Sequence, residues 1–378
     1  MKKNEEKSKY VAKTLAGLEE ILAGELKDLG ATEIKILTRA VEFQGNRDVL
    51  YRANYCCRCA LRFLLPLASF QVHEQNDLYT RVVDLDWDLY LDPGKTLAVD
   101  AVINKSVFTN SHFVAQKTKD AIVDRFRRQW GVRPSVNLDD PDIRINVYLT
   151  GEECTVALDS SGASLHKRGY RKMTGLAPIN EVLAAGMIRL SGWDGKMLLL
   201  DPMCGSGTIL IEAALLARKI PAGFFREKFG FMKWKDFDPE QWHILKEKEN
   251  DKIIQTCPEL YGSDISPKAI SDVRHNLAFT GLVDFVHLEV KPFDRTRMPA
   301  ENGMIITNPP YDERLRLDDT IGFYKSIGDV LKKKYTSYEA WVISSDLKAL
   351  KFIGLHPSKK ITLFNGPLEC RFVQFKLY

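Results

Sequence analysis

The segment from Met197 to Ala217 constrains the fold of this 378-residue chain more than any other. An apolar run ends at Asp201, and a second apolar run follows a turn that contains Gly205 and Gly207. A short apolar run, a glycine-rich turn and a longer apolar run predict a buried strand joined tightly to a helix. This unit is typical of an open α/β sheet, which binds ligands at the carboxyl ends of its strands.

The turn does not match either of the two common phosphate-binding loops. The dinucleotide fingerprint has a third glycine three positions after Gly207, where this chain has Leu210. The Gly-Lys-Thr of the chain begins at Gly94, and Leu89 stands where the phosphate loop has its first glycine. An ordinary connection between a strand and a helix remains the alternative, because glycine marks turns of many kinds.

Two aspartates follow the next two apolar runs. Asp264 ends the first of them, and an acid at the end of a second strand can bind both hydroxyls of a ribose. It comes 57 residues after Gly207, instead of the usual ~20, and we interpret Arg218 to Cys257 as a helical insertion. Asp294 comes soon after an expected third strand, Val286 to Val290. An aspartate that caps a turn is the alternative at that position.

A further strand end carries the most informative motif of the chain. The apolar run Met304 to Thr307 leads directly into Asn308-Pro309-Pro310-Tyr311, and the two prolines make the turn stiff and extended. The Asn308 side-chain oxygen and the Pro309 carbonyl could accept both N–H bonds of an exocyclic base amine, and Tyr311 could stack on the extruded base. The tetrapeptide resembles the catalytic motif of methyltransferases that modify such amines. A strand that ends in a polyproline turn with a surface tyrosine is the alternative.

Composition and charge narrow the class of protein. The hydrophobic content of 45% is ordinary for a globular protein. No apolar run approaches the ~20 residues that a membrane helix needs, so we expect no membrane insertion. The charged N-terminus, Met1 to Lys7, lacks the apolar core of a signal peptide, which predicts a cytoplasmic location. A net charge of +4 permits nucleic-acid binding without arguing for it.

The seven cysteines show no disulfide spacing. Cys56 and Cys59 form one C-x-x-C, but no second pair or nearby histidine completes a zinc site. We therefore expect no bound metal. We expect buried thiols instead, within an amphipathic helix from Leu50 to Leu65.

Two α+β units in series are predicted before residue 165, where we expect the chain to divide. Gly17 to Leu29 has the apolar side of a helix, and a capping glycine follows it. The helix expected from His112 to Trp130 carries basic side chains that could follow RNA phosphates, and a solvated helix face is the alternative. The predicted strands are Glu33 to Leu37, Val41 to Phe43, Leu97 to Ile103, Ile143 to Leu149 and Glu153 to Leu158.

These features, in this order, resemble one family. The N-terminal half resembles a ferredoxin-like segment followed by a THUMP domain, which is an RNA-binding module. The C-terminal half resembles a Rossmann-like class I methyltransferase domain. Leu165 to Arg171 and Ala177 to Glu181 resemble the family's junction and its motif X, which packs along the cofactor. The chain is thus similar to the large-subunit ribosomal RNA N2-guanine methyltransferases, in a short form with one catalytic domain. Asp312 departs from the family pattern, which usually has a small residue there.

The resemblance implies an α/β fold with three parts. Residues 1–65 would form a ferredoxin-like segment, 66–163 a THUMP domain, and 164–378 a methyltransferase domain with a mainly parallel seven-stranded sheet. It implies S-adenosylmethionine as the cofactor, RNA as the partner, and catalysis by Asn308, Pro309, Pro310 and Tyr311. The residues implied for cofactor binding are Ala177, Pro178, Asp201, Met203, Cys204, Gly205, Ser206, Gly207, Thr208, Asp264, Ile265, Asp294 and Asn308, and those implied for RNA binding are Lys117, Lys119, Arg127, Arg128, Lys167, Arg168 and Arg171.

Three other functions stay open at this point. An N6-adenine nucleic-acid methyltransferase shares the Asn308 tetrapeptide, because this motif recognises only an exocyclic amine on a ring that can stack. A tRNA N2-guanine methyltransferase is the second, and a non-catalytic RNA-binding assembly protein is the third. The RNA-binding N-terminal half argues against a DNA enzyme, and the intact Asn308 argues against a protein without catalysis. Nothing in the sequence indicates an oligomeric state.

Overall fold

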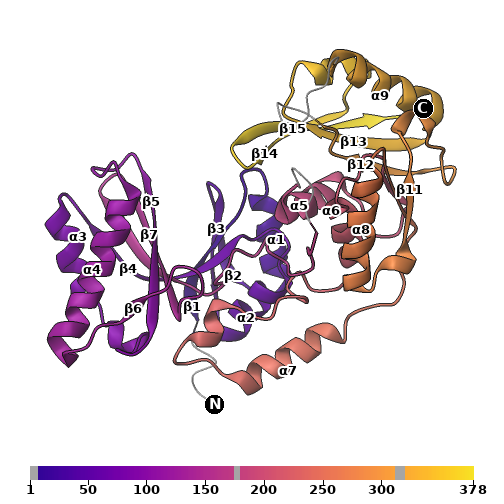
Figure 1. Ribbon diagram of the computed structural model, residues 1–378. Coiled ribbons are helices and arrows are strands. Elements are labelled where there is room, and N and C mark those ends of the chain that lie inside the picture. Colours follow the sequence, from indigo (N-terminus) through magenta and orange to yellow (C-terminus); the bar gives the residue numbers. More distant parts are fainter. Residues whose placement is uncertain (1–6, 174–178, 311–319) are drawn as a thin grey trace.

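The computed structural model describes residues 7–173, 179–310 and 320–378. It contains one sheet in each half of the chain (Figure 1), and the α+β half and the Rossmann-like half predicted from the sequence are both confirmed. None of the helices within these three ranges is long and apolar enough to cross a membrane.

The eight strands described in the N-terminal half form one continuous sheet, in the order β2-β3-β1-β4-β8-β7-β5-β6. β4 (Arg62–Gln71) joins the two predicted units, because it pairs antiparallel with both β1 (Ser8–Lys13) and β8 (Glu153–Asp159). The expected boundary between residues 65 and 66 therefore falls inside one strand. The other elements are β2 Thr32–Leu37, β3 Ala40–Gly45, β5 Thr96–Asn104, β6 Ser135–Val136, β7 Ile143–Thr150, α1 Glu19–Asp28, α2 Arg47–Cys56, α3 Gln75–Val83, the 3-10 turn η2 Trp87–Leu89 and α4 Ser111–Trp130.

The helix predicted from Leu50 to Leu65 is wrong in its second half. α2 ends at Cys56, and the chain turns before it enters β4. In this turn the backbone N–H groups of Arg58 and Cys59 donate to the carboxylate of Glu25 on α1, at 3.1 and 3.0 Å. A side chain from another element thus satisfies two backbone donors outside a helix, and no local pattern reveals such a partner.

Within the described residues the C-terminal sheet has seven strands in the order β11-β10-β9-β12-β13-β15-β14, which is the expected number. The expectation of a mainly parallel sheet needs a correction, because the sheet is mixed: β15 runs antiparallel to both of its neighbours, while the other pairings are parallel. Alternate residues of the central strands face two cores, one formed with α5, α6 and α8 and the other with α9. The elements are α5 Glu181–Ser191, β9 Leu199–Asp201, α6 Thr208–Ala217, η3 Gly230–Lys233, α7 Pro239–Asn250, β10 Leu260–Asp264, α8 Pro267–Thr280, η4 Val283–Phe285, β11 Val286–Val290, η5 Phe293–Arg295, β12 Gly303–Thr307, α9 Thr320–Lys334, β13 Tyr338–Ser344, η6 Ala349–Ile353, β14 Lys359–Asn365 and β15 Leu368–Lys376.

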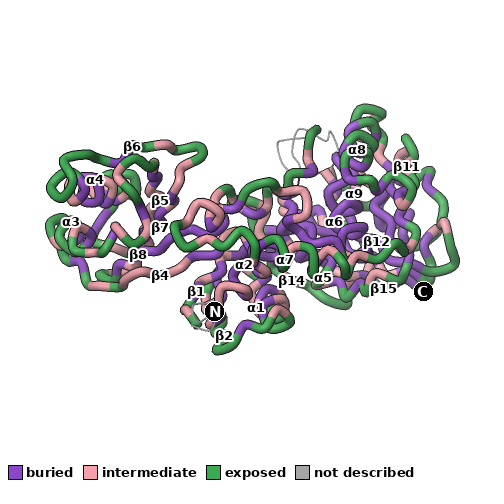
Figure 2. The backbone as a smooth tube through the Cα atoms, turned by 90° about the horizontal axis from the view of Figure 1, so that it is seen from below, coloured by how far each residue is buried: buried purple, intermediate pink, exposed green. Residues whose placement is uncertain are grey.

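The insertion predicted between the first helix and the second strand of this half packs on the N-terminal half. It contains η3 and α7, and α7 runs beside α2 (Figure 1). The ring of Phe231 stacks on Tyr51 with the centroids 4.4 Å apart, and Trp242 meets the same tyrosine edge-on at 6.0 Å. The two halves therefore share one apolar core. Figure 2 shows buried residues gathered at this contact and through the C-terminal half, and more exposed residues at the end formed by α3 and α4.

Candidate active site

Three strand ends meet at the carboxyl edge of the C-terminal sheet. β9 pairs in parallel with β10 on one side and with β12 on the other. Asp201 ends β9, Asp264 ends β10, and Asn308 follows the last residue of β12. Because neighbouring parallel strands end at one edge, the structure brings together three residues that were predicted from three separate motifs.

Asp201 is the most buried acid of this edge, with 1% of its surface exposed. Its Oδ1 accepts hydrogen bonds from the Thr307 hydroxyl at 2.8 Å and from the Met203 backbone N–H at 3.3 Å. Burial raises the pKa of the Asp201 carboxyl from 3.8 to about 7, because the charged form is poorly solvated there and those two donors offset only part of the effect. A cation placed beside this carboxyl would hold it in its ionised form.

Thr307 is a residue of this region that the sequence interpretation missed. It is the last residue of β12, it is 1% exposed, and it directly precedes Asn308. Its hydrogen bond to Asp201 joins two motifs that lie 106 positions apart. The position of Thr307 directly before Asn308 could have indicated it, because a hydroxyl at the end of a buried strand needs a hydrogen-bond partner.

The glycine-rich turn leaves space beside Asp264. The backbone N–H of Gly205 donates to the Oδ2 of Asp264 at 3.0 Å. Gly205 has a φ of 53°, and a Cβ built there would meet no atom of the described residues within 4 Å. Gly207 differs, because it has a φ of 78° and a Cβ there would come within 2.6 Å of the Cγ1 of Val273 on α8. Gly207 is therefore required for packing, whereas Gly205 borders an open cradle that a small ligand could enter.

The other cofactor candidates lie around this turn or outside the described residues. Ile265, directly after β10, exposes 72% of its surface. Asp294 is exposed within η5, which follows β11. Ala177, Pro178 and the catalytic candidate Tyr311 fall outside the described ranges. The remaining candidates form the turn and the start of α6, and they are half-buried Met203 and buried Cys204, Ser206 and Thr208.

The side chain of Asn308 presents an unused acceptor. Its Oδ1 is buried, and no donor among the described residues contacts it. Leaving a buried polar atom unpaired costs about 1–3 kcal/mol, so this oxygen is suited to a ligand that brings an N–H donor. Pro309 is buried and Pro310 is half-buried, which fixes the turn around the asparagine.

Two of the arginines predicted to contact RNA lie in the interior instead. Arg168 is 1% exposed, and its Nε lies 3.4 Å from the carboxylate of Glu212 on α6. The side chain of Arg171 is 12% exposed and pairs with Glu181 on α5 at 2.8 Å. The RNA assignment of Arg168 and Arg171 is therefore wrong, because these ion pairs hold the junction against the two helices. Lys167 is exposed and keeps its place among the candidates.

The basic candidates on α4 are at the surface but have local partners. Lys117 lies over the ring of Tyr79 on α3, 4.9 Å from its centroid, and Arg128 donates to the hydroxyl of the same tyrosine at 3.1 Å. Arg127 and Lys119 pair with aspartates of their own helix at 3.2 and 2.5 Å. Surface ion pairs are worth only about 0–1 kcal/mol, so phosphates could replace these aspartates.

The thiols and acids of the described residues are side chains that could form disulfides or hold a metal ion. None of the seven cysteines forms a disulfide, and five of them are buried. Burial raises the pKa of the Cys204 thiol well above its usual range, which keeps this residue of the turn protonated. No group of three His, Cys, Asp or Glu residues within the described ranges could hold a metal ion.

Three family models match successive parts of the chain. The ferredoxin-like domain of RlmL matches residues 9–64, the THUMP domain matches 73–159, and the RMKL-like methyltransferase domain matches 168–374. A Synechocystis protein, provisionally named RNA methyltransferase slr0064, is 38% identical over 98% of this chain and 97% of its own length. The ribosomal RNA large subunit methyltransferase K/L of Psychromonas ingrahamii is 39% identical over 97% of this chain, but the chain spans only 50% of that relative.

Solved structures agree with this match. A provisionally named methyltransferase crystallised with SAH has a TM-score of 0.89 and 29% identity, over 100% of this chain and 99% of that chain. A Listeria monocytogenes protein, described as a predicted N6-adenine-specific DNA methylase, has a TM-score of 0.87 and 28% identity over 99% and 97%. SAH is S-adenosylmethionine without its methyl group, and the acids and open cradle beside Gly205 suit such a molecule. The chain therefore belongs to the RMKL-like methyltransferase-domain family, and its methyl donor is S-adenosylmethionine.

Proposed function

We propose that this protein transfers a methyl group from S-adenosylmethionine to the exocyclic N2 amine of a guanine in 23S ribosomal RNA, in the cytoplasm. The observation that carries the proposal is the buried Oδ1 of Asn308, an acceptor that lacks a donor among the described residues. It lies at the sheet edge where Asp201 and Asp264 also end their strands. An exocyclic amine brings the N–H donor that this oxygen lacks.

The proposed chemistry depends on how the amine is held. An aromatic amine is a poor nucleophile, because its lone pair is delocalised into the ring. When the Asn308 Oδ1 and the Pro309 carbonyl accept its two N–H bonds, the lone pair turns outward and the nitrogen is held in line for attack. The bound cofactor would supply the methyl group from its sulfonium: the N–C bond would form as the S–C bond breaks, SAH would leave, and the amine would release one proton to solvent. Thr307 directly precedes Asn308. Its hydrogen bond to Asp201 therefore fixes Asn308, which would accept from the amine, relative to the acid that would bind the cofactor.

The acids of the site would hold the cofactor. We assign the ammonium group to Asp201, the ribose hydroxyls to Asp264 and the adenine amine to Asp294. Asp264 already accepts one backbone N–H on each oxygen, from Gly205 at 3.0 Å and from Ser266 at 2.9 Å. A carboxylate has about four acceptor sites, so these bonds orient Asp264 and leave room for two hydroxyls.

RNA as the substrate class is supported by the THUMP match and by the names of the relatives. α4, with Arg127 and Arg128, lies at the end of the molecule away from α8 and α9 (Figure 1). A substrate that contacts both this helix and the Asn308 site must therefore extend across the N-terminal half. That span favours a large structured RNA over a short nucleotide ligand.

The choice of guanine rests on family resemblance, and adenine N6 is the second candidate. The similar Listeria protein is named for adenine in DNA, and Asn308 with Pro309 would accept either amine. Guanine offers an N1–H donor and an O6 acceptor beside its amine, whereas adenine offers only an N1 acceptor. A pocket built for guanine would leave buried polar groups unpaired when adenine entered, and such a loss costs several kcal/mol.

Methylation of ribosomal RNA by the purified protein tests the proposal. Ribosomal RNA is incubated with cofactor labelled on the methyl group, and its nucleosides are separated and identified by mass spectrometry. We expect labelled N2-methylguanosine with the parent protein and little label with Asn308→Ala, which serves as the matched control. N6-methyladenosine would overturn the guanine assignment and keep the amine chemistry. Absence of label in RNA despite cofactor binding would favour the non-catalytic assembly protein.

A further inference from the structure

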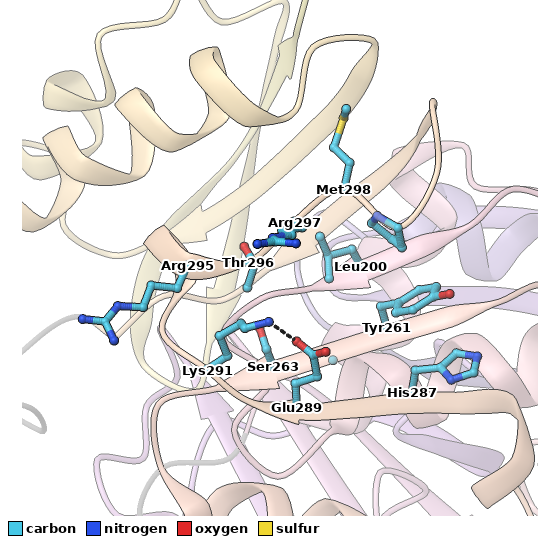
Figure 3. A pocket seen from close by; sticks show the side chains of 12 residues that line it. Leu200, Tyr261, Ser263, His287, Glu289, Lys291, Arg295, Thr296, Arg297 and Met298 are labelled. Carbon is cyan, nitrogen blue, oxygen red and sulfur yellow. Dashed lines mark hydrogen bonds and ion pairs between the residues drawn. The ribbon is translucent and has the colours of Figure 1, made fainter.

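A hollow of about 450 Å³ lies on the C-terminal sheet where β10 and β11 face away from α8. Leu260 and Val286 belong to the core formed with α5, α6 and α8. Since strand side chains alternate between faces, Tyr261 and His287 point to the opposite side and line the hollow (Figure 3). α9 packs against the β12 and β13 part of this same face. The connection from β11 to β12 borders the part of this face that α9 does not cover. His287 and Glu289 are exposed in that part.

The floor of the hollow is aromatic. The rings of Tyr261 and His287 stack across neighbouring strands, with their centroids 4.7 Å apart and their planes 24° apart. β11 is an edge strand of the sheet, and His287 is exposed. Tyr261 is half-buried, and its hydroxyl donates to Glu259 at 2.9 Å. Accessible aromatic rings on adjacent strands form a surface on which bases stack with little regard to their identity.

The rim of the hollow carries positive charge without matching acids. Arg295 and Arg297 are exposed, and no carboxylate of the described residues pairs with either of them. In Figure 3, Arg297 reaches over the hollow near Leu200, while Arg295 points outward from the same connection. Lys291 pairs with Glu289 at 2.8 Å, so the acid among the lining residues is already compensated. Unpaired guanidinium groups beside an aromatic floor match a phosphate joined to a base.

Two residues that line the hollow are adjacent in the sequence to residues of the candidate active site. Leu200 and Ser263 line it, and they directly precede the cofactor acids Asp201 and Asp264. We propose that this hollow binds one nucleotide of a single-stranded segment of the substrate RNA, its base against Tyr261 and His287 and its phosphate on the arginines of the rim. The proposal rests on RNA being the substrate class. Among the described residues that line the hollow, the unpaired charges are positive, and beside an aromatic floor this favours a nucleotide over a segment of protein.

Crosslinking and binding measurements on the full chain test this site. A fluorescent ten-nucleotide RNA that contains 4-thiouridine is bound to the parent protein and irradiated, and crosslinked peptides are identified by mass spectrometry. We expect crosslinks at Tyr261 or His287. Arg297→Glu should lower the slope of log affinity against log salt by about 0.7 for each phosphate that the variant no longer binds. His287→Ala should weaken binding roughly tenfold.

The control variants separate this site from general effects of charge. Arg297→Lys keeps the charge and should retain most of the salt slope. Lys351→Glu makes the same reversal as Arg297→Glu at an exposed position on η6 and should change neither the slope nor the crosslinks. Cofactor affinity, measured by calorimetry with SAH, should be unchanged in all four variants.

Several outcomes would overturn the inference. If the parent methylates RNA while Arg297→Glu and His287→Ala bind and crosslink as the parent does, this site is wrong and the proposed function stands. If the parent methylates no RNA, the proposed function fails instead. Loss of the crosslink in millimolar AMP, with RNA affinity unaffected by the variants, would assign the hollow to free nucleotides. A change in sedimentation of Arg297→Glu without a change in RNA affinity would assign it to a protein contact.

Discussion

Cofactor affinity should fall as the pH is lowered through 7, because the proposed contact of Asp201 with the ammonium group requires an ionised carboxyl. The pKa of this carboxyl is raised to about 7 by burial, so acidification neutralises it in the free protein. Asp201→Asn removes the titration and preserves the packing. The Asn oxygen can still accept the hydrogen bonds from Thr307 and Met203 that now reach the carboxylate.

The magnitude follows from the ionised fraction of Asp201. With a pKa of about 7, roughly half of the carboxyl is ionised at pH 7 and about 3% at pH 5.5. If only the ionised form binds, affinity falls about 15-fold over this interval, equal to about 1.6 kcal/mol. The ammonium group of the ligand stays protonated throughout, because α-amino groups titrate near ~8. Stability of the free protein should move the opposite way: a raised acid pKa favours the folded state at low pH, and that contribution is lost as the pH rises from 3.8 to about 7.

Titration calorimetry with SAH at pH 5.5 and 7.0 checks this prediction. Repeating the pH 5.5 measurement in two buffers of different protonation enthalpy should show the release of nearly one proton on binding. Asp201→Asn should bind more weakly at pH 7.0 and show no change between the two values. Asp264→Asn, the control, should weaken binding at both values and retain a pH dependence, with a smaller ratio because the charge of Asp264 contributes to the raised pKa of Asp201. The reasoning fails if the parent shows no pH dependence, or if Asp201→Asn keeps the 15-fold ratio.

Asn308→Ala should lower turnover by about 10² or more and leave SAH affinity nearly unchanged, since it removes one preorganised acceptor at the reacting centre; parent-like turnover would remove Asn308 from the mechanism. Gly207→Ala should lower the melting temperature more than Gly205→Ala, because both have a positive φ but only the former meets Val273; equal shifts would contradict the packing argument. Reversing the charges of Arg127 and Arg128 should weaken RNA binding and reduce its salt dependence. This is measured in the full chain, because the insertion completes the core of the N-terminal half, and an unchanged salt slope would move the RNA surface elsewhere.

Much of the C-terminal half could be predicted because its signals are local. β9 and β12 are short apolar runs, and β11 alternates apolar with polar residues. Strands of either pattern are specified by neighbours in the sequence. The acids and the asparagine stand at the ends of these runs. Their positions in the chain therefore indicated which residues would reach the carboxyl edge.

The N-terminal half shows where this reasoning ends. Apart from the helix over Leu50 to Leu65, the elements predicted there lie within a few residues of the observed ones, but β1, β4, β6 and α3 were not predicted. The two units were expected in series, and β4 fuses them into one sheet. The turn after Cys56 was mistaken for helix, because the acceptor that replaces the helical hydrogen bonds is Glu25, 34 positions before Cys59. Pairings over such distances leave no periodic trace in the sequence.

The sequence by itself determined the strand–turn units, their order along the chain and the residue types offered for cofactor and amine binding. Only the tertiary structure decided which polar groups are buried and with what partner. From the sequence, Arg168 is expected to be a surface cation, but the structure places it in the interior, paired with Glu212. Asp201 is expected to be an ordinary acid, but burial raises its pKa to about 7. The physical reason is that solvation and pairing depend on residues brought together by the fold. Thr307 and Asp201, 106 positions apart, are joined in this way.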